Sequence, residues 1–158
     1  MTRFSNVLLT TLLAALPLVI PLSANADYVK PQMQHAPFGE VKVVVPLTSA
    51  DPAVWNFKLR NALNGVKGIR DWGGALDVKF VLYGAGVKML MQPDEATRSA
   101  IDQLRSAGVK FEICNNTLMG MNLDWHELYD VQQADIVPAG FLEVGWLANH
   151  GWAVEALN

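Results

Sequence analysis

Cys114 is the only cysteine in this chain of 158 residues, and the polar residues Asn115, Asn116 and Thr117 follow it directly. The thiolate is the form of cysteine that acts as a nucleophile, and backbone N–H groups at the start of a helix stabilise it and lower the cysteine pKa. One cysteine excludes an intrachain disulfide, a Cys-x-x-Cys redox pair and a multi-cysteine metal or iron–sulfur site. Any sulfur chemistry in this chain therefore depends on a single thiol.

Other residue types that commonly carry chemistry are not grouped. His35, His126 and His150 lie in three separate segments without the spacing of metal ligands, so we expect no metal site. The GAG motif at 84–86 lacks the rest of a dinucleotide-binding fingerprint and predicts only a tight turn, and no Gly-x-Ser-x-Gly nucleophile elbow is present. The sequence predicts no metal and no cofactor.

Short apolar, β-branched runs alternate with segments of helical spacing from residue 41 onward. We expect strands at 41–47, 76–83, 109–114, 134–137 and 152–157. Asp51 with Pro52 is typical of a helix start, and a second helix is expected to start at Pro93 and to end before Gly108. Shorter helices are expected around 118–121, within 123–131 and through 141–146. The stripe expected to be buried on the second helix is Ala96, Ala100, Ile101, Leu104 and Ala107.

Strands separated by helices are typical of βαβ units, which form a parallel sheet with helices on both faces. The sequence therefore predicts an α/β fold, a three-layer α/β/α sandwich with a mostly parallel sheet of about five strands. With about 130 residues after residue 26, the chain has room for one domain of ordinary size. We expect this domain to span 41–158, with an extended lead-in at 27–40.

Ligands of open parallel sheets bind at the carboxyl ends of the strands. The turns predicted at this edge contain Ser49, Gly84, Gly86 and Gly140, which could line a pocket. The strand that ends at Cys114 reaches the same edge. We expect Asn115-Asn116-Thr117 to cap the helix that follows, with backbone N–H groups of Asn116, Thr117 and Leu118 stabilising the thiolate. The alternative is that Cys114 only fills space, since free cysteine is among the most buried residue types.

Residues 1–26 have the three parts of a secretory signal peptide: a basic start at Arg3, an apolar stretch at 7–22 and an Ala-x-Ala end. We expect cleavage before Asp27, export to the periplasm and no stable membrane insertion afterwards. The alternative, an uncleaved anchor, is disfavoured because about 16 apolar residues with two prolines are short of the roughly 20 that a span needs. Cleavage would leave 11 basic and 15 acidic residues. This acidic balance, without a basic cluster, argues against a nucleic-acid partner.

Three motifs resemble the DsrE/DsrF-like (YchN-like) family: residues 78–86 (VKFVLYGAG), 108–118 (GVKFEICNNTL), and 137–140 (VPAG) followed by 151–153 (GWA). The similarity runs in register from about residue 41 to residue 157. The resemblance implies an α/β sandwich that assembles into homotrimers or hexamers, and kinship with sulfur-relay subunits in which one cysteine carries sulfane sulfur as a persulfide. The position that matches this cysteine is Cys114. Where relay subunits have small residues and arginines after the cysteine, this chain has Asn-Asn-Thr-Leu-Met, and its nearest preceding cation is Lys110.

Two hypotheses follow. In the first, the chain is a periplasmic sulfur carrier whose Cys114 takes sulfane sulfur from a donor protein and passes it to an acceptor thiol by exchange chemistry. In the second, it is a non-catalytic oligomeric binding or scaffold protein of the same fold, in which Cys114 is structural.

Overall fold

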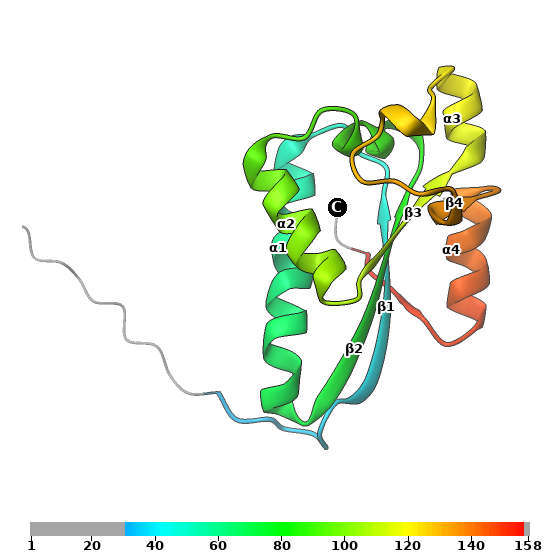
Figure 1. Ribbon diagram of the computed structural model, residues 1–158. Helices are drawn as coiled ribbons and strands as arrows, with labels where there is room; N and C mark the ends of the chain where they lie inside the picture. The colour runs from blue at the N-terminus through cyan, green and yellow to red at the C-terminus, as the bar shows by residue number, and fades with distance from the viewer. Residues whose placement is uncertain (1–30, 157–158) are drawn as a thin grey trace, which may run out of the picture. The chain divides into compact units, whose positions relative to one another are not determined.

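Nine helices and strands alternate along the part of the chain that the structure, a computed structural model, describes, which is residues 31–156 (Figure 1). The described residues from Met33 onward belong to one compact unit, and the fold given below is the fold of that unit. The strands are β1 (Gly39–Leu47), β2 (Gly74–Leu82), β3 (Lys110–Cys114), β4 (Ile136–Val137) and β5 (Ala153–Val154). The α-helices are α1 (Pro52–Gly68), α2 (Glu95–Ser106), α3 (Asn115–Met121) and α4 (Gly140–Asn149), and 3₁₀ turns lie at Ile69–Trp72, Gly84–Leu90, Trp125–Glu127 and Gln133–Asp135.

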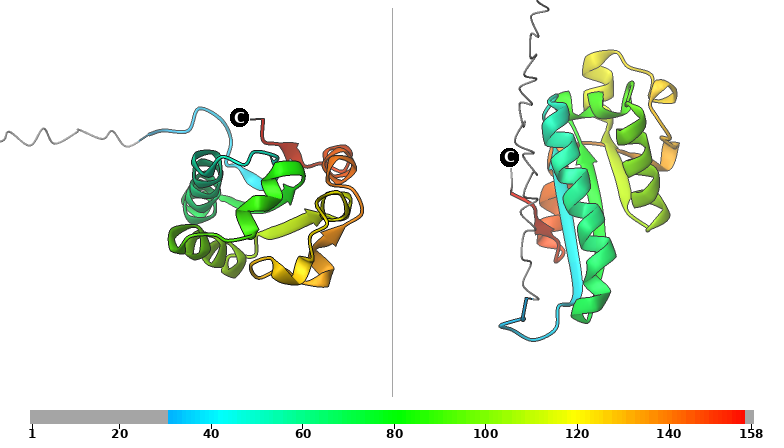
Figure 2. Two further views of the ribbon diagram at one scale, coloured as in Figure 1. Left: turned by 90° about the horizontal axis from the view of Figure 1, so that it is seen from above. Right: turned by 90° about the vertical axis from the view of Figure 1, so that its left-hand side faces the viewer.

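The strands form one parallel sheet in the order β4-β3-β2-β1-β5. Helices α1 and α2 cover one face of the sheet and α4 covers the other, as the two views of Figure 2 show. This arrangement confirms the predicted three-layer α/β/α sandwich with a parallel sheet of five strands. Because all the strands run the same way, their carboxyl ends meet at one edge, and α3 starts there.

Apolar side chains alternate between the two sheet faces, as the strand period of two requires. Phe80 of β2 and Phe111 of β3 point to the α1–α2 side, where their rings stack with centroids 4.9 Å apart. Val44 and Val81 point to the opposite face and pack against Leu147 of α4. The larger core therefore lies under α1 and α2, and a smaller one lies under α4.

Asp51 starts α1 as predicted, because its carboxylate accepts a hydrogen bond of 2.9 Å from the Ala53 N–H. The stripe predicted for α2 is partly wrong. Ile101 and Leu104 are buried, but Ala96 and Ala107 are exposed, and Thr97 is buried instead. The Asp94 carboxylate caps the helix by accepting a hydrogen bond from the Thr97 N–H, which determines which side of the helix faces the sheet. Thr97, Ile101 and Leu104 lie at positions i, i+4 and i+7 and therefore share the inward face.

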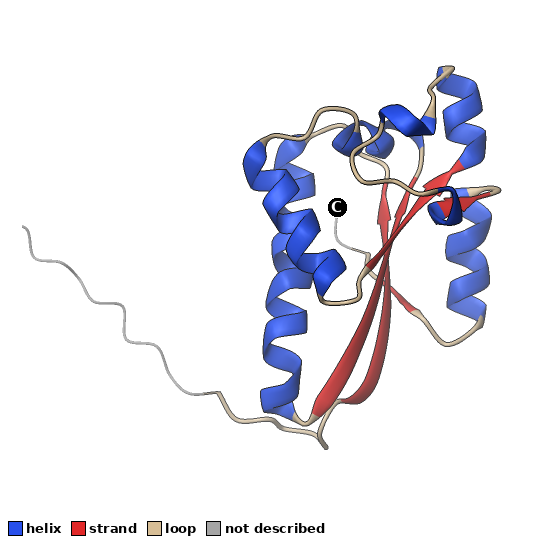
Figure 3. Cartoon of the chain, viewed as in Figure 1, coloured by secondary structure: helices blue, strands red, loops and turns tan. Residues whose placement is uncertain are grey.

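Three other element predictions differ from the structure in extent. The outer strands β4 and β5 have only two residues each, whereas β1 and β2 have nine (Figure 3). A 3₁₀ turn at Gln133–Asp135, closed by a capping box, replaces the first part of the strand predicted at 134–137. The GAG motif opens a 3₁₀ turn, Gly84–Leu90, instead of forming only a tight turn.

The predicted lead-in at 27–40 ends early, because Gly39 already pairs with Gly74 in the sheet. The predicted signal peptide, residues 1–26, and the first part of the lead-in lie outside the described residues. Among residues 31–156, no helix is both long enough and apolar enough to span a membrane.

Candidate functional site

Strand β3 brings Cys114 to the carboxyl edge of the sheet. Phe111 and Ile113 alternate with Cys114, so they fill the α1–α2 core while Cys114 faces the α4 side. Helix α3 follows without a loop, and Cys114 itself is its N-cap residue, with extended backbone angles of φ −70° and ψ 114°. The prediction that Asn115-Asn116-Thr117 would cap this helix is therefore wrong: α3 already starts at Asn115, directly after the strand, so Cys114 is itself the N-cap residue and these three residues form the first turn of the helix.

Gly140, the first residue of α4, lies against Cys114. A β-carbon at position 140 would lie 2.9 Å from the Tyr83 Cβ and 3.1 Å from the Cys114 Cβ, closer than ordinary carbon contacts. Only glycine therefore allows the start of α4 to approach the thiol this closely. The contact leaves Cys114 with 5% of its surface exposed.

Burial alone would raise the pKa of the Cys114 thiol, and this is the largest single effect on it. Hydrogen-bonding groups outweigh burial and hold the pKa below its ordinary value: the Gly140 N–H, the hydroxyl and N–H of Thr117, and the Asn116 N–H. The sulfur forms no standard capping hydrogen bond with α3, so the N–H groups of that helix act mainly through their dipoles. The starts of two helices, α3 and α4, thus favour the thiolate together.

The Thr117 hydroxyl is fixed by a second contact. It accepts a hydrogen bond of 2.9 Å from the Gly84 N–H, which leaves its own proton available to the sulfur. Gly84, Thr117, Cys114 and Gly140 therefore form one cluster, although they come from three separate turns.

Of the thiolate-stabilising residues predicted from the sequence, Asn116 and Thr117 act on the sulfur, whereas Leu118 is buried in the core under α1 and α2. Gly140 was expected only as a pocket residue, and its role as an N–H donor was missed. The signal that could have revealed it is the Pro-Ala-Gly turn before a helix, which follows a strand adjacent to the one that ends at Cys114.

Ser49 and Gly86 belong to a different part of the edge. Ser49 is part of the turn before α1, where its hydroxyl accepts from the Asp51 N–H. Gly86 lies so close to the backbone of Leu47 that a β-carbon there would be 1.9 Å from the Leu47 carbonyl oxygen. Both therefore lie beside the end of β1, which β2 separates from β3 in the sheet. The structure thus brings Gly84 and Gly140 to Cys114, but not Ser49 and Gly86.

The charges near Cys114 on its face of the sheet are already paired. Glu112, two residues before the thiol, forms an ion pair of 2.6 Å with Lys79 of β2, and Lys79 also lies over the Trp152 ring. Lys110 lies on the same face, at the far end of β3. The thiolate is therefore stabilised by backbone and hydroxyl dipoles, without an adjacent unpaired cation among the β3 and β2 residues on this face.

The histidines have local partners. His126 forms a contact of 2.6 Å with Asp124 and stacks on Trp125, and His150 bonds through Nδ1 to the Trp146 carbonyl. No group of three potential metal ligands occurs among residues 31–156.

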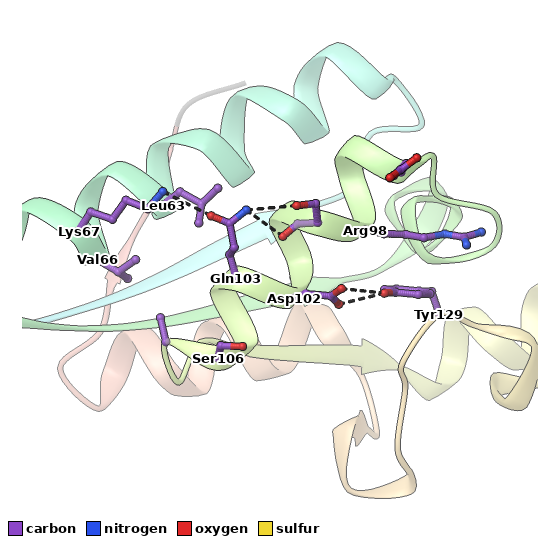
Figure 4. Close-up of a pocket in the computed structure, with 11 residues that line it drawn as sticks. Leu63, Val66, Lys67, Arg98, Asp102, Gln103, Ser106 and Tyr129 are labelled. Atoms are coloured by element: carbon purple, nitrogen blue, oxygen red, sulfur yellow. Dashed lines mark hydrogen bonds between the residues drawn. The ribbon is translucent and has the colours of Figure 1, made fainter.

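A groove of about 660 Å³ lies between α1 and α2 (Figure 4). Cys114 faces the α4 side of the sheet, so the groove and the thiol lie on opposite faces. Its polar side chains bind one another: the Tyr129 hydroxyl donates to the Asp102 carboxylate at 2.9 Å, and Gln103 links Lys67 to Ser99. The hydrogen bond to Asp102, together with burial and the charge of that carboxylate, raises the pKa of Tyr129 above its ordinary value. The groove therefore offers a tyrosine whose protonated form is favoured and side chains that are hydrogen-bonded to one another, and no cysteine lies in its lining. It is lined by Leu63, Val66, Lys67, Glu95, Arg98, Ser99, Asp102, Gln103, Ser106, Ala107 and Tyr129.

The fold and the site define a class: parallel α/β sandwich proteins with a buried cysteine at the carboxyl edge of the sheet. The chain is similar in structure to the protein of unknown function MTH1491 from Methanobacterium thermoautotrophicum, with a TM-score of 0.62 and 22% identity over 73% of this chain and 97% of that one. It is also similar to the conserved protein of unknown function BT1422 from Bacteroides thetaiotaomicron, with a TM-score of 0.51 and 18% identity over 72% of this chain and 91% of that one. These similarities show the fold alone.

No model of a protein family matches the chain. No curated protein matches its sequence.

Proposed function

We propose that this chain is a periplasmic sulfur carrier in which Cys114 accepts sulfane sulfur as a persulfide and passes it to an acceptor thiol. The observation that carries the proposal is the convergence of the α3 start, the α4 start and the Thr117 hydroxyl on the only thiol of the chain. The resemblance to the DsrE/DsrF-like family and the export signal predicted at 1–26 support the same function and compartment.

The transfer needs no cofactor and no external oxidant. The Cys114 thiolate attacks the outer sulfur of a donor persulfide, so that a new sulfur–sulfur bond forms while the donor bond breaks, and the donor leaves as a thiol. An acceptor thiolate then attacks the outer sulfur on Cys114 and leaves with it, which regenerates the Cys114 thiolate. Each step exchanges one sulfur–sulfur bond for another, so no net oxidation occurs.

The local dipoles suit this exchange. A lowered pKa increases the thiolate fraction at neutral pH, and it also makes Cys114 a better leaving group when the acceptor attacks. The persulfide adds one sulfur–sulfur bond of about 2 Å, which extends the reactive atom beyond the nearly buried Sγ position.

The test is the intact mass of purified mature protein after incubation with polysulfide or thiosulfate. We expect one adduct of about 32 Da per chain, removed by dithiothreitol and absent from Cys114→Ser. Gly120→Ala, which changes an exposed position of α3 away from the thiol, should form the adduct like the wild type.

Absence of the adduct in folded wild-type protein would refute the carrier function. The 5% exposure of Cys114 favours a second candidate for that case: a non-catalytic oligomeric binding or scaffold protein in which Cys114 serves packing. This candidate predicts that the sulfur reacts only after the protein is unfolded.

A further inference from the structure

A recess of about 460 Å³ lies on the outward side of α4, next to β5. None of the described residues that line it is charged, and two of its walls are Phe141 and Trp146, which expose 74% and 55% of their surface. Glu143, the only charged residue of α4, is half-buried and does not line it. We call this hollow the α4 recess, and its main lining residues are Tyr83, Phe141, Leu142, Gly145, Trp146 and Val154.

The α4 recess adjoins the candidate site. Tyr83 lines the recess, and the same side chain lies against Gly140, whose N–H acts on the Cys114 sulfur. Phe141, a second wall, directly follows Gly140 in the chain. One end of the recess is therefore next to the helix start that contacts the thiol.

The charges around the thiol do not suit an anionic partner compound. Small anions are usually bound by arginine or lysine. On this face of the sheet Lys79 is already paired with Glu112, and Lys110 lies at the far end of β3. An anion at the thiol would therefore meet only helix dipoles, whereas an apolar group would meet the uncharged walls of the α4 recess.

We propose that the α4 recess binds the organic part of a small thiol or persulfide with an uncharged, apolar carbon skeleton, with which Cys114 exchanges sulfur. The inference rests on the proposed sulfur-carrier function and narrows it to one chemical class of exchange partner. The thiolate of the compound attacks the outer sulfur of the Cys114 persulfide, a new sulfur–sulfur bond forms as the bond to Cys114 breaks, and Cys114 leaves as the thiolate. The reverse reaction loads Cys114, and neither direction needs an oxidant.

The dimensions of this exchange match the first turn of α4. Two sulfur–sulfur distances of about 2 Å each separate the Cys114 Sγ from the sulfur of the compound, so the first carbon lies roughly 5–6 Å from Sγ. One turn of an α-helix is about 5.4 Å long. A compound whose sulfur reacts at the start of α4 thus has its carbon skeleton beside Phe141 and Leu142, which belong to that turn.

The size of the recess favours a small molecule over a protein. Its volume of about 460 Å³ lies within the range of roughly 300–1,000 Å³ that is typical of small-molecule sites. The exposed surface of Phe141, Leu142, Trp146 and Val154 amounts to roughly 400–500 Å². A stable protein interface needs about 800 Å² per partner.

The test compares two acceptor thiols on the wild-type protein. Cys114 is first loaded with inorganic polysulfide, and the loss of the adduct of about 32 Da is then followed by mass after addition of benzyl mercaptan or mercaptoacetate at equal thiolate concentrations. The same two thiols reacting with glutathione persulfide in solution give their intrinsic rate ratio. Because burial of roughly 60 Å² of a benzene ring corresponds to about a ten-fold effect, we expect the protein to favour benzyl mercaptan about ten-fold more than glutathione persulfide does.

Two variants assign this preference to the α4 recess. Gly145→Trp should fill the recess and abolish the preference, because a β-carbon at position 145 meets no other atom within 4 Å and the side chain has room to enter. Gly120→Trp is the matched control, since position 120 on α3 is equally open and does not line the recess.

Phe141→Lys places a cation at the recess and should shift the preference toward mercaptoacetate. Its control is Met119→Lys, because Met119 is 70% exposed on α3 and does not line the recess. A change in the pKa of Cys114 alters the leaving group that both reactions share, so the rate ratio is insensitive to it. Circular dichroism shows whether each variant is folded.

The loading step and the rate ratio separate the two proposals. A wild-type protein that loads with polysulfide but shows only the solution ratio would overturn the role of the α4 recess and leave the carrier function in place. The same holds if folded Gly145→Trp and Phe141→Lys keep the wild-type ratio as their controls do. A protein that does not load refutes the carrier function, and this inference with it.

Discussion

Replacing Gly140 with alanine tests the contact that forms the candidate site. The new methyl group would lie between 2.9 and 3.1 Å from three carbon atoms of Tyr83 and Cys114, where carbon atoms normally lie 3.5–4.0 Å apart. Relief of this overlap requires the start of α4 to move away from the thiol. We expect the free energy of unfolding to fall by about 1–3 kcal/mol, the usual cost of overpacking a filled interior. The same movement takes the Gly140 N–H away from the sulfur, so the pKa of Cys114 should rise.

Both effects can be measured on one pair of variants. Urea unfolding gives the stability, and the rate of iodoacetamide alkylation against pH gives the pKa of Cys114. The control is Gly120→Ala in α3, where a β-carbon would meet no atom within 4 Å, and where alanine should stabilise the helix by about 0.5–1 kcal/mol. If Gly140→Ala is as stable as this control and its alkylation profile is unchanged, Gly140 does not hold the thiol in the way described.

Three other predictions follow from the structure and the sequence. Thr117→Val removes the hydroxyl beside the sulfur and should raise the pKa of Cys114. A pKa that is lower in the folded state adds stability as pH rises through it, and this stability is complete above the unfolded value of about 8.5. The free energy of unfolding in urea should therefore increase less with pH for the variant than for the wild type, and an equal increase would contradict this role of Thr117. Lys58→Met should lower the free energy of unfolding by about 3–5 kcal/mol, because it leaves Glu155 without its buried ion-pair partner. The double variant Lys58→Met with Glu155→Gln should recover most of this loss. Equal stability of the single and double variants in urea would count against the ion pair. The exported protein should begin at Asp27, and mass analysis that finds residues 1–26 still attached would exclude cleavage there.

The sheet was predictable because its strands are short apolar runs with clear helix starts between them. Asp51 before Pro52 marks the start of α1 in the sequence, and it does so through the same hydrogen bond in the structure. The alternation of Phe111 and Ile113 with Cys114 likewise predicts which face carries the thiol. Local patterns of this kind determine local structure, and right-handed βαβ connections leave few topologies to consider.

The site was only half predictable, because part of it depends on contacts between segments that are distant in the sequence. That Asn116 and Thr117 act on the sulfur follows from their position after Cys114. The approach of Gly140 depends on how β4 pairs with β3, and the Thr117–Gly84 hydrogen bond depends on the turn after β2. The residues adjacent to Cys114 in the sequence therefore predict neither contact. The phase of α2 was missed for a different, local reason: the hydrogen bond from the Thr97 N–H to the Asp94 carboxylate determines where the helix starts, and the spacing of the apolar residues alone did not show this.

The measurement that tests the central claim most directly is the rate of alkylation of Cys114 by iodoacetamide as a function of pH in the folded wild-type protein. The account predicts nearly stoichiometric labelling without denaturant and a midpoint below the value of about 8.5 for a free cysteine, because the α3 and α4 starts and Thr117 favour the thiolate. A midpoint at 8.5 or above, or labelling only after unfolding, would contradict a reactive thiol at this edge of the sheet and with it the sulfur-carrier function.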